Sequence, residues 1–389
     1  MRNFLAKQME DIQPSGIRKF FDIVSEQPDA ISLGVGEPDF DTPRHMTEEG
    51  IRSMREGRTF YTANAGLLPL RERISSYLTE RVGVKYSPES EIIVTVGGSE
   101  AIDLALRVFI DPGDEVIIPQ PCFVCYEPIT QMVHGKPVTI DLQAENEFKL
   151  TPEQLEEAIT EKSKILILSY PNNPTGAVMD RESLIKIADV VKKHDLLVIS
   201  DEIYAELLYD EEFVSISSLP DMRERTIVIN GFSKGFAMTG WRLGFVAGPE
   251  DFIQQMLKVH QYIIMAAPTA SQYAALEGLK DWHDTVETMR VSYEERRNYL
   301  HHELTRIGLP CYRAKGAFYL FPQVSQFGIS SEEFALRLLD EQNLAVVPGS
   351  AFGASGEGFL RLSYAYSIDE LKEAVKRLEK FVLDLQENK

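Results

Sequence analysis

The sequence predicts an α/β fold in which helices cover both faces of a mainly parallel sheet. Between residues 91 and 248, short apolar runs rich in Ile, Val and Leu alternate with amphipathic segments. Apolar runs without polar alternation are typical of strands that are buried on both faces. Residues 281–389 differ, because long amphipathic segments there surround short strand-like runs. This second pattern predicts a smaller α+β domain.

The larger part follows a regular order of strands and helices. The expected strands are EIIVTV (91–96), DEVIIP (114–119), KILILSY (164–170), LLVISDE (196–202), TIVIN (226–230) and LGFVAG (243–248). The segments 99–109 (SEAIDLALRVF) and 182–194 (ESLIKIADVVKKH) place apolar residues at helical spacing. Each predicts a helix that follows a strand, as in a parallel sheet.

The two ends of the chain are expected to pack together. Long helices are expected at 291–307 and 367–385, with short strands within AFYLFP (317–322), AVVPG (345–349) and FLRLSYA (359–365). Near the N-terminus, SGIRKFFDIV (15–24) reads as a capped helix start and AISLGVGEPDF (30–40) as a strand that ends in turns. This N-terminal segment is too short to fold alone. We therefore expect residues 1–45 to pack on a small domain of residues 281–389, beside a large domain of residues 46–280.

Composition excludes several classes of function. The formal net charge is −20, which argues against nucleic-acid binding, since that needs a dense basic patch. No apolar run approaches the roughly 18 residues that a membrane span needs. The first residues, MRNFLAKQMEDIQ, lack the apolar core of a secretory signal, so a cytoplasmic location is expected.

The cysteines suggest no metal or redox site. Cys122 and Cys125 form a CxxC pair, but the surrounding QPCFVCY is a poor match to a thioredoxin-like motif. A zinc site would need a second pair of ligands. We expect both cysteines to be small buried residues.

Polar residues follow the predicted strands at the edge where parallel sheets bind ligands. Gly97, Gly98, Ser99 and Glu100 follow the first strand, where small residues before a helix suit an anion such as phosphate. The later strand ends supply Asn173 in PNNPTG, Asp201 and Tyr204 in SDEIY, and Ser233, Lys234 and Arg242 in GFSKGFAMTGWRLG. Each has an ordinary structural explanation when taken alone, such as a helix cap or a surface ion pair. Their occurrence together is harder to explain in that way.

Lys234 is the most informative of these residues, because it lies among Gly, Phe and Ala instead of other polar residues. Burial beside a cation lowers a lysine pKa and makes the amine a better nucleophile. Pyridoxal phosphate catalysis needs such a lysine, an acid for the pyridine nitrogen and an anion site for the phosphate. The set of strand-end residues therefore predicts this cofactor.

The chain also resembles the class I aminotransferases of fold type I, related to aspartate aminotransferase. The resemblance runs from about Ser15 to the C-terminus. The motifs SLGVGEPDF, YTANAGLLPLR, PNNPTG, SDEIY, GFSKGFAMTGWRLG and FLRLSYA match in order and spacing. The most similar branch is the bacterial and archaeal one with aromatic, alanine and N-acetyl-diaminopimelate aminotransferases. The family implies a seven-stranded sheet, pyridoxal phosphate, and a homodimer with composite active sites.

The resemblance also implies roles for individual residues. Lys234 matches the lysine that carries the cofactor and moves the proton, and Asp201 matches the acid at the pyridine nitrogen. Tyr204 and Asn173 match the groups that bond the ring hydroxyl, and Arg361 matches the arginine that binds the substrate α-carboxylate. The remaining matches concern the phosphate (Gly98, Ser99, Glu100, Ser233, Arg242, and Tyr61 from the neighbouring subunit), the ring face (Phe123) and the substrate pocket (Gly36, and Arg18 as one candidate).

The expected activity is transfer of the amino group of an L-amino acid to a 2-oxo acid, with 2-oxoglutarate as acceptor, by a ping-pong aldimine mechanism. The donor is expected in the alanine, aromatic or aspartate class. Ser99 stands where one aspartate-specific branch has a lysine, which favours neutral donors. A C–S β-lyase or decarboxylase on the same fold is the alternative, and lysine and cofactor alone do not separate the two. A ligand-sensing regulator would need an added basic DNA-binding domain.

Overall fold

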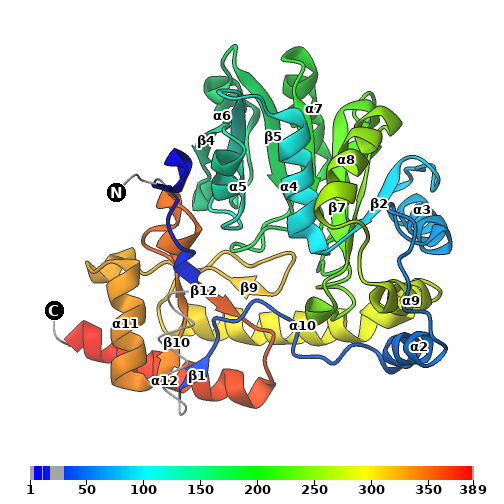
Figure 1. The fold of residues 1–389 in the computed structure, drawn as a ribbon. Helices are drawn as coiled ribbons and strands as arrows, with labels where there is room; N and C mark the ends of the chain where they lie inside the picture. Colours follow the sequence, from blue (N-terminus) through cyan, green and yellow to red (C-terminus); the bar gives the residue numbers. More distant parts are fainter. Residues whose placement is uncertain (1–3, 11, 18–29, 388–389) are drawn as a thin grey trace.

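The structure is a computed structural model that describes residues 4–10, 12–17 and 30–387. The described residues form a central sheet of seven strands (Figure 1). The strands are β2 (Ile92–Thr95), β3 (Glu115–Gln120), β4 (Lys136–Asp141), β5 (Ser163–Ser169), β6 (Leu197–Asp201), β7 (Thr226–Gly231) and β8 (Gly244–Ala247). Their order is β2-β8-β7-β6-β5-β3-β4. β8 runs antiparallel to both β2 and β7, and every other neighbouring pair is parallel. The predicted α/β class with a mainly parallel sheet is confirmed.

Helices cover both faces of this sheet. Successive side chains of a strand point to opposite faces, so in β5 Ile165 and Ile167 pack in one apolar cluster, whereas Leu166 and Leu168 pack in another. The first cluster includes α4 (Gly97–Phe109), α5 (Tyr126–Met132) and α8 (Glu250–Ile263). On the other face lie α6 (Pro152–Ala158) and α7 (Arg181–Lys193). A third apolar cluster joins α3 (Leu68–Val82) and α9 (Thr269–Gly278) to strands β2, β7 and β8. The carboxyl ends of the strands are left for loops.

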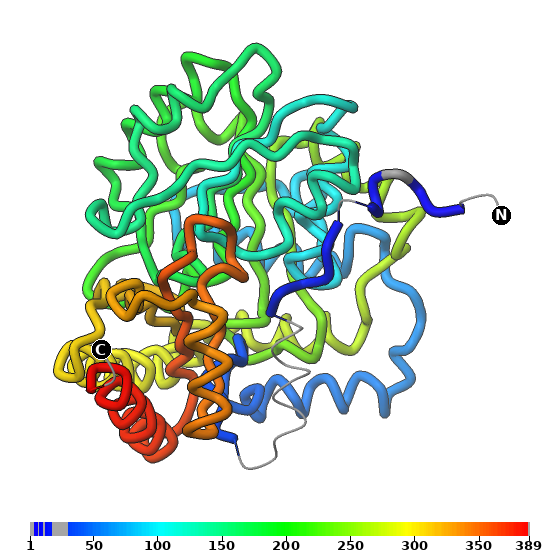
Figure 2. The backbone as a smooth tube through the Cα atoms, turned by 90° about the vertical axis from the view of Figure 1, so that its left-hand side faces the viewer, coloured from blue at the N-terminus to red at the C-terminus, as the bar shows by residue number. Residues whose placement is uncertain are grey.

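The remaining elements lie below the sheet in Figure 1. The long helix α10 (Trp282–Arg306) crosses beneath it, and α2 (Arg44–Arg55) packs against α9. Strands β9 (Tyr319–Leu320), β11 (Val347–Pro348) and β12 (Leu360–Ser363) form an antiparallel sheet beside α11 (Ser331–Gln342) and α12 (Ile368–Glu387). Figure 2 shows α11 and α12 together, in orange and red, away from the sheet.

The N-terminal strand pairs with a C-terminal strand. β1 (Ile31–Ser32) runs parallel to β10 (Leu344–Ala345), with Ile31 opposite Leu344. Ser363 N also donates to Leu33 O over 2.8 Å. Residues 31–33 are thus bonded to the last third of the chain. The domain boundaries at residues 45 and 280 stay predictions.

Three sequence expectations differ from the structure or lie outside it. The sequence analysis missed β4, an edge strand whose residues are mostly exposed or half-buried, so KPVTID lacks the apolar run of its neighbours. The helix α10 begins at Trp282, earlier than the expected 291, because its first turns lie against the larger part of the chain. The expected helix start at 15–24 lies mainly outside the described residues.

Short 3-10 turns connect many elements: η1 (Lys7–Glu10), η2 (Ala144–Asn146), η3 (Ile216–Ser218), η4 (Arg223–Arg225), η5 (Thr239–Trp241), η6 (Ser325–Phe327), η7 (Gly349–Phe352) and η8 (Ala354–Gly356).

Within the described ranges, no helix has the length and apolar character of a membrane span, and no group of three or more His, Cys, Asp or Glu residues could hold a metal ion. Cys122 is buried and Cys125 half-buried, both thiols are free, and burial raises the pKa of each.

Candidate active site

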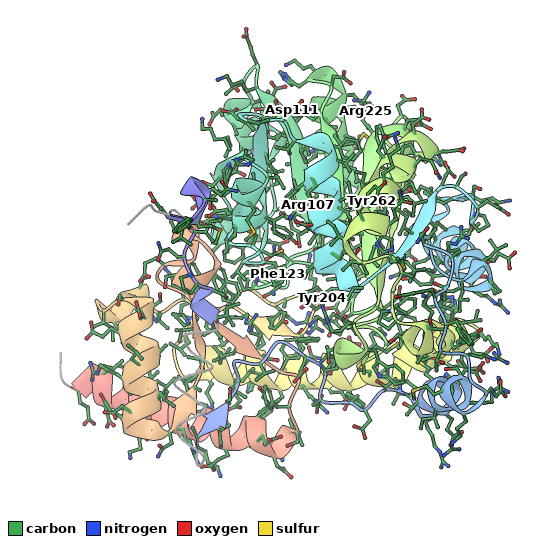
Figure 3. The ribbon with its side chains drawn as sticks, viewed as in Figure 1. Arg107, Asp111, Phe123, Tyr204, Arg225 and Tyr262 are labelled. Atoms are coloured by element: carbon green, nitrogen blue, oxygen red, sulfur yellow. The ribbon has the colours of Figure 1, made fainter. Side chains whose placement is uncertain are left out.

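A cavity of 410 Å³ lies at the carboxyl ends of the parallel strands. It is also bordered by the N-terminal segment at Val35–Glu37 and by β9 and β12 from the C-terminal part. Figure 3 labels Phe123 and Tyr204 in this region, between the sheet above and α10 below. The predicted residues that line the cavity are Gly36, Gly98, Ser99, Phe123, Asn173, Asp201, Tyr204, Ser233, Lys234, Arg242 and Arg361.

Lys234 lies three residues after β7 and extends into the cavity. Its Nζ donates to Gly36 O over 2.5 Å and lies 5.8 Å from the Tyr204 ring centroid and 5.7 Å from that of Phe318. Burial, with a further contribution from the positive charge of Arg361, lowers the Lys234 pKa to about 8. A substantial fraction of the amine is therefore neutral, and nucleophilic, near neutral pH.

Asp201 is the last residue of β6, and its carboxylate is buried at the inner end of the cavity. Tyr126 Oη donates to Oδ2 over 2.7 Å, and Ile203 N donates to Oδ1 over 3.3 Å. Burial raises the Asp201 pKa, and the bond from Tyr126 opposes this shift. Since two carboxylate oxygens offer about four acceptor positions, Asp201 can accept a further N–H from a ligand.

Arg361, on β12, is almost fully buried and faces the same cavity. Its Nη1 donates to Asn173 Oδ1 over 3.0 Å and its Nη2 to Gly34 O over 2.5 Å. The guanidinium carbon lies 4.5 Å from the Tyr319 ring centroid, and Nε has no partner among the described residues. Burial lowers the Arg361 pKa, but no acidic side chain neutralises the group within the described contacts. The side chain is therefore fixed in place and ready to bind an anion such as a carboxylate.

Tyr204 and Tyr319 join two sides of the cavity. Their hydroxyl oxygens are 2.8 Å apart, so one donates to the other. The Tyr319 hydroxyl also explains a glycine, because a Cβ on Gly36 would lie 2.7 Å from that oxygen. Burial, together with the neighbouring Tyr319, raises the Tyr204 pKa well above its ordinary value. Tyr204 is therefore a neutral hydroxyl that can donate to a ligand.

The end of the cavity that is formed by the start of α4 and by Arg242 suits a phosphate. Gly98 and Ser99 open α4, and a helix N-terminus presents unpaired N–H groups to an anion. Arg242, at φ 52°, places Nη1 2.9 Å from Thr239 O. Gly97, at φ +78°, makes room for this arginine, because a Cβ there would lie 2.9 Å from Arg242 Nη2. Ser233 adds a hydroxyl at the same cavity.

Three predicted residues are not brought into the cavity. The Glu100 carboxylate bonds Val96 N and the His260 ring and does not line the cavity. Tyr61 is 81% exposed and does not line this chain's own cavity. Arg18 lies outside the described residues.

Sequence reasoning missed Tyr126, Tyr319 and Gly34. Tyr126 follows β3 in QPCFVCY, so the rule applied to the other strand ends could have found it. Tyr319 belongs to the small antiparallel sheet and Gly34 contributes only a backbone carbonyl. No local pattern in the sequence marks either one.

Comparison with known proteins places this geometry in a family. The family model "Aminotransferase class I and II" matches residues 28–378. The chain is 53% identical to YugH of Bacillus subtilis (strain 168), over 98% of this chain and 99% of that protein. It is 46% identical to an aspartate aminotransferase of Pyrococcus abyssi, over 97% of both chains. The crystal structure of an aromatic aminotransferase from Pyrococcus horikoshii superposes with a TM-score of 0.90 at 45% identity, covering 94% of this chain and 99% of that one.

Proposed function

The chain belongs to the class I and II aminotransferases, which use pyridoxal phosphate, and we propose that it takes the amino group from amino acids with uncharged side chains. The acceptor in this proposal is a 2-oxo acid, with 2-oxoglutarate expected. The observation that carries it is the convergence of Lys234 and Arg361 on one cavity. A nucleophilic amine can hold the cofactor aldehyde, and a fixed guanidinium can bind the α-carboxylate of a 2-amino acid.

The residues around the cavity fit pyridoxal phosphate. Asp201 has acceptor capacity left for a ring N–H. Asn173 uses its Oδ1 for Arg361, and its Nδ2 has no partner among the described residues, so it can donate to a ring hydroxyl beside Tyr204. Gly98, Ser99, Ser233 and Arg242 would hold the phosphate, and the Phe123 ring would cover one ring face.

When bound, the cofactor supplies an electron sink for the bonds at the substrate Cα. Lys234 would hold it covalently through Nζ. The same amine, when neutral, can take the proton from Cα and return it, since it lies on the cavity side of Gly36. Asp201, buried and bonded by Tyr126, would accept the N–H of the ring nitrogen and keep a positive charge there.

Arg361 would bind the substrate α-carboxylate, and its two bonds to Asn173 and Gly34 fix the plane of the guanidinium. Gly36 lies at the same side, where a Cβ would be 2.7 Å from Tyr319 Oη and 3.6 Å from Arg361 Nη1, so a larger residue would intrude on this site. Both features favour one orientation of the substrate.

The donor proposal rests on the charges around the cavity. Among the described lining residues, the cations are Lys234, Arg242 and Arg361, and each has a place in the scheme above. The other side chains toward the opening include Ile17 and Val35. A buried second carboxylate without a cation is costly. The acceptor 2-oxoglutarate also carries a second carboxylate, so in this proposal that group is met by solvent or by a cation outside the described lining residues, with Arg18 as the candidate. The names of the relatives include both aspartate and aromatic aminotransferases, so they do not decide the donor.

Two experiments test these proposals. Borohydride reduction followed by peptide mapping should place the cofactor on Lys234, and a label elsewhere would contradict the proposed site. Values of kcat/KM for alanine, phenylalanine, tyrosine and aspartate with one acceptor should favour the uncharged donors. An aspartate lead of about tenfold, or about 1.4 kcal/mol, would refute the argument from charge. The lyase alternative is not favoured, because the relatives are named aminotransferases.

A homodimer with composite sites is part of the proposal. Phe60 and Tyr61 are 82% and 81% exposed, and Tyr262 at the end of α8, labelled in Figure 3, is 87% exposed. The two segments are adjacent, since Asn64 Nδ2 donates to Met265 O over 2.8 Å. Exposed aromatic residues gathered in this way are typical of an interface. Tyr61 would reach the phosphate site of the partner subunit.

Two further expectations remain proposals. The division into residues 1–45, 46–280 and 281–389 is supported by the separate apolar clusters above and below the cavity, and limited proteolysis would test it. The cytoplasmic location can be checked by cell fractionation.

A further inference from the structure

His260, on α8, lies outside the cavity and makes two hydrogen bonds while fully buried. Its Nδ1 is 2.6 Å from Glu100 Oε1, and its Nε2 is 3.0 Å from the backbone oxygen of Asn64. A carbonyl oxygen only accepts, so Nε2 carries a proton. A carboxylate also only accepts, so a second proton must lie between Nδ1 and Oε1, because two lone pairs would repel each other at this distance. Glu100 and His260 therefore share a proton inside the molecule.

Each partner is tied to a different phosphate contact: Glu100 to the start of α4 at this chain's own cavity, and His260 to the segment of Tyr61, which in the proposed dimer faces the partner subunit's cavity. The second oxygen of Glu100 accepts from Val96 N, the residue that precedes α4 and has no side-chain cap of its own. Gly98 and Ser99 follow directly and line the cavity. On the other side, His260 holds Asn64, three residues after Tyr61. The segment that carries Tyr61 is also bonded at Phe60, whose oxygen accepts from Thr269 Oγ1 over 2.8 Å.

We propose that Glu100 and His260 are a pair of positioning residues that lock the N-terminus of α4 to the segment carrying Tyr61 and so set the affinity for the cofactor phosphate. Glu100 then acts on the phosphate through the backbone of α4 and not by contact. This inference rests on the proposed phosphate role of Gly98 and Ser99. It adds two residues that touch neither cofactor nor substrate.

The test compares pyridoxal phosphate with pyridoxal, which lacks the phosphate, in titrations of the full chain freed of cofactor. His260→Leu removes both hydrogen bonds of the ring, and Glu100→Ala removes the bonds to Val96 and His260. In each variant the affinity for pyridoxal phosphate should fall by about tenfold or more, the effect of losing a buried hydrogen bond to a charged group. The affinity for pyridoxal should change by less than about twofold. The ratio of the two affinities therefore reports on the phosphate site alone.

Two variants serve as controls. In Glu100→Gln, the amide oxygen can accept from Val96 N while the amide nitrogen donates to Nδ1 of a neutral His260, so every bond is kept and the ratio should stay within about twofold of the native value. His301→Leu removes another partly buried histidine, whose Nε2 bonds Cys311 O over 3.1 Å in the C-terminal part. It should lower stability without changing the ratio.

The outcomes separate this inference from the proposed function. A ratio unchanged in both His260→Leu and Glu100→Ala, or lowered equally in His301→Leu, would overturn the inference. If His260→Leu does not fold, Glu100→Ala and Glu100→Gln still give the comparison. Nitrogen NMR of labelled histidine should show a proton on Nε2 of His260 in the native protein, since Asn64 O can only accept, and an Nε2 without a proton would also overturn the inference. If the native protein fails to bind pyridoxal phosphate at Lys234, the proposed function fails instead.

Discussion

Replacing Arg361 by lysine should weaken substrate binding far more than it slows the chemical step. A guanidinium has five N–H donors, of which the bonds to Asn173 Oδ1 and Gly34 O use one each and leave three for a carboxylate. A lysine ammonium has three donors on one atom, so it cannot serve both protein acceptors and still hold a carboxylate through two bonds. At about 1.5–3 kcal/mol for each lost charge-assisted bond, the loss is about 3 kcal/mol, or about a hundredfold in kcat/KM.

The loss should appear in KM. The α-carboxylate keeps its charge throughout the reaction, so Arg361 binds ground state and transition state about equally, and removing such an interaction raises KM with little change in kcat. Steady-state rates with phenylalanine as donor give both constants. Arg313→Lys is the matched control, because Arg313 lies at the surface, where it bonds Asn298 Oδ1 over 3.0 Å. A KM in Arg361→Lys within about twofold of the native value would refute the assigned role.

Three further changes test other parts of the site. Because only the neutral amine is nucleophilic, uptake of pyridoxal phosphate by the cofactor-free protein should speed up as pH rises through about 8, the lowered pKa of Lys234, and level off above it; a midpoint near the ordinary lysine value would contradict the burial argument. Asp201→Asn should keep the fold and the cofactor, as circular dichroism and absorbance would show, but lower kcat by about a hundredfold or more, since an amide cannot hold a positive ring nitrogen. A near-native kcat would leave Asp201 with a structural role only. Mixing Tyr61→Ala chains with Lys234→Ala chains should restore activity in heterodimers, because both lesions fall in one composite site. Verified heterodimers without activity would assign Tyr61 to its own subunit.

Strands buried on both faces could be predicted from the sequence, and the edge strand could not. β5 and β7 each contain an unbroken run of buried Ile, Leu or Val residues, 165–168 in β5 and 227–229 in β7, so their composition marks them. β4 pairs with another strand on one edge only and carries Lys136, Thr139 and Asp141, which give no apolar run. Its place beside β3 depends on backbone pairing, which single-sequence patterns do not report.

The residues of the candidate site also differ in whether the sequence alone could place them there. Asp201, Asn173 and Lys234 could be predicted because a parallel sheet brings its carboxyl ends to one edge. Glu100 could not be placed correctly, because consecutive residues of a helix point about 100° apart, so its neighbour Ser99 faces the cavity while Glu100 faces His260. Tyr319 lies on β9, and only the packing of the C-terminal part against the large sheet brings its hydroxyl to Tyr204.

The parallel pairing of β1 with β10 has a consequence for biosynthesis. The ribosome makes Ile31 long before its partner Leu344, and all seven strands of the central sheet emerge in between. The sheet can therefore form on the nascent chain, whereas the N-terminal strand must wait until β10 has been made. Gly34 and Gly36, which bond Arg361 and Lys234, lie just after that strand. The candidate site is thus completed last, and before β1 is in place Lys234 lacks the backbone oxygen of Gly36 that accepts its hydrogen bond.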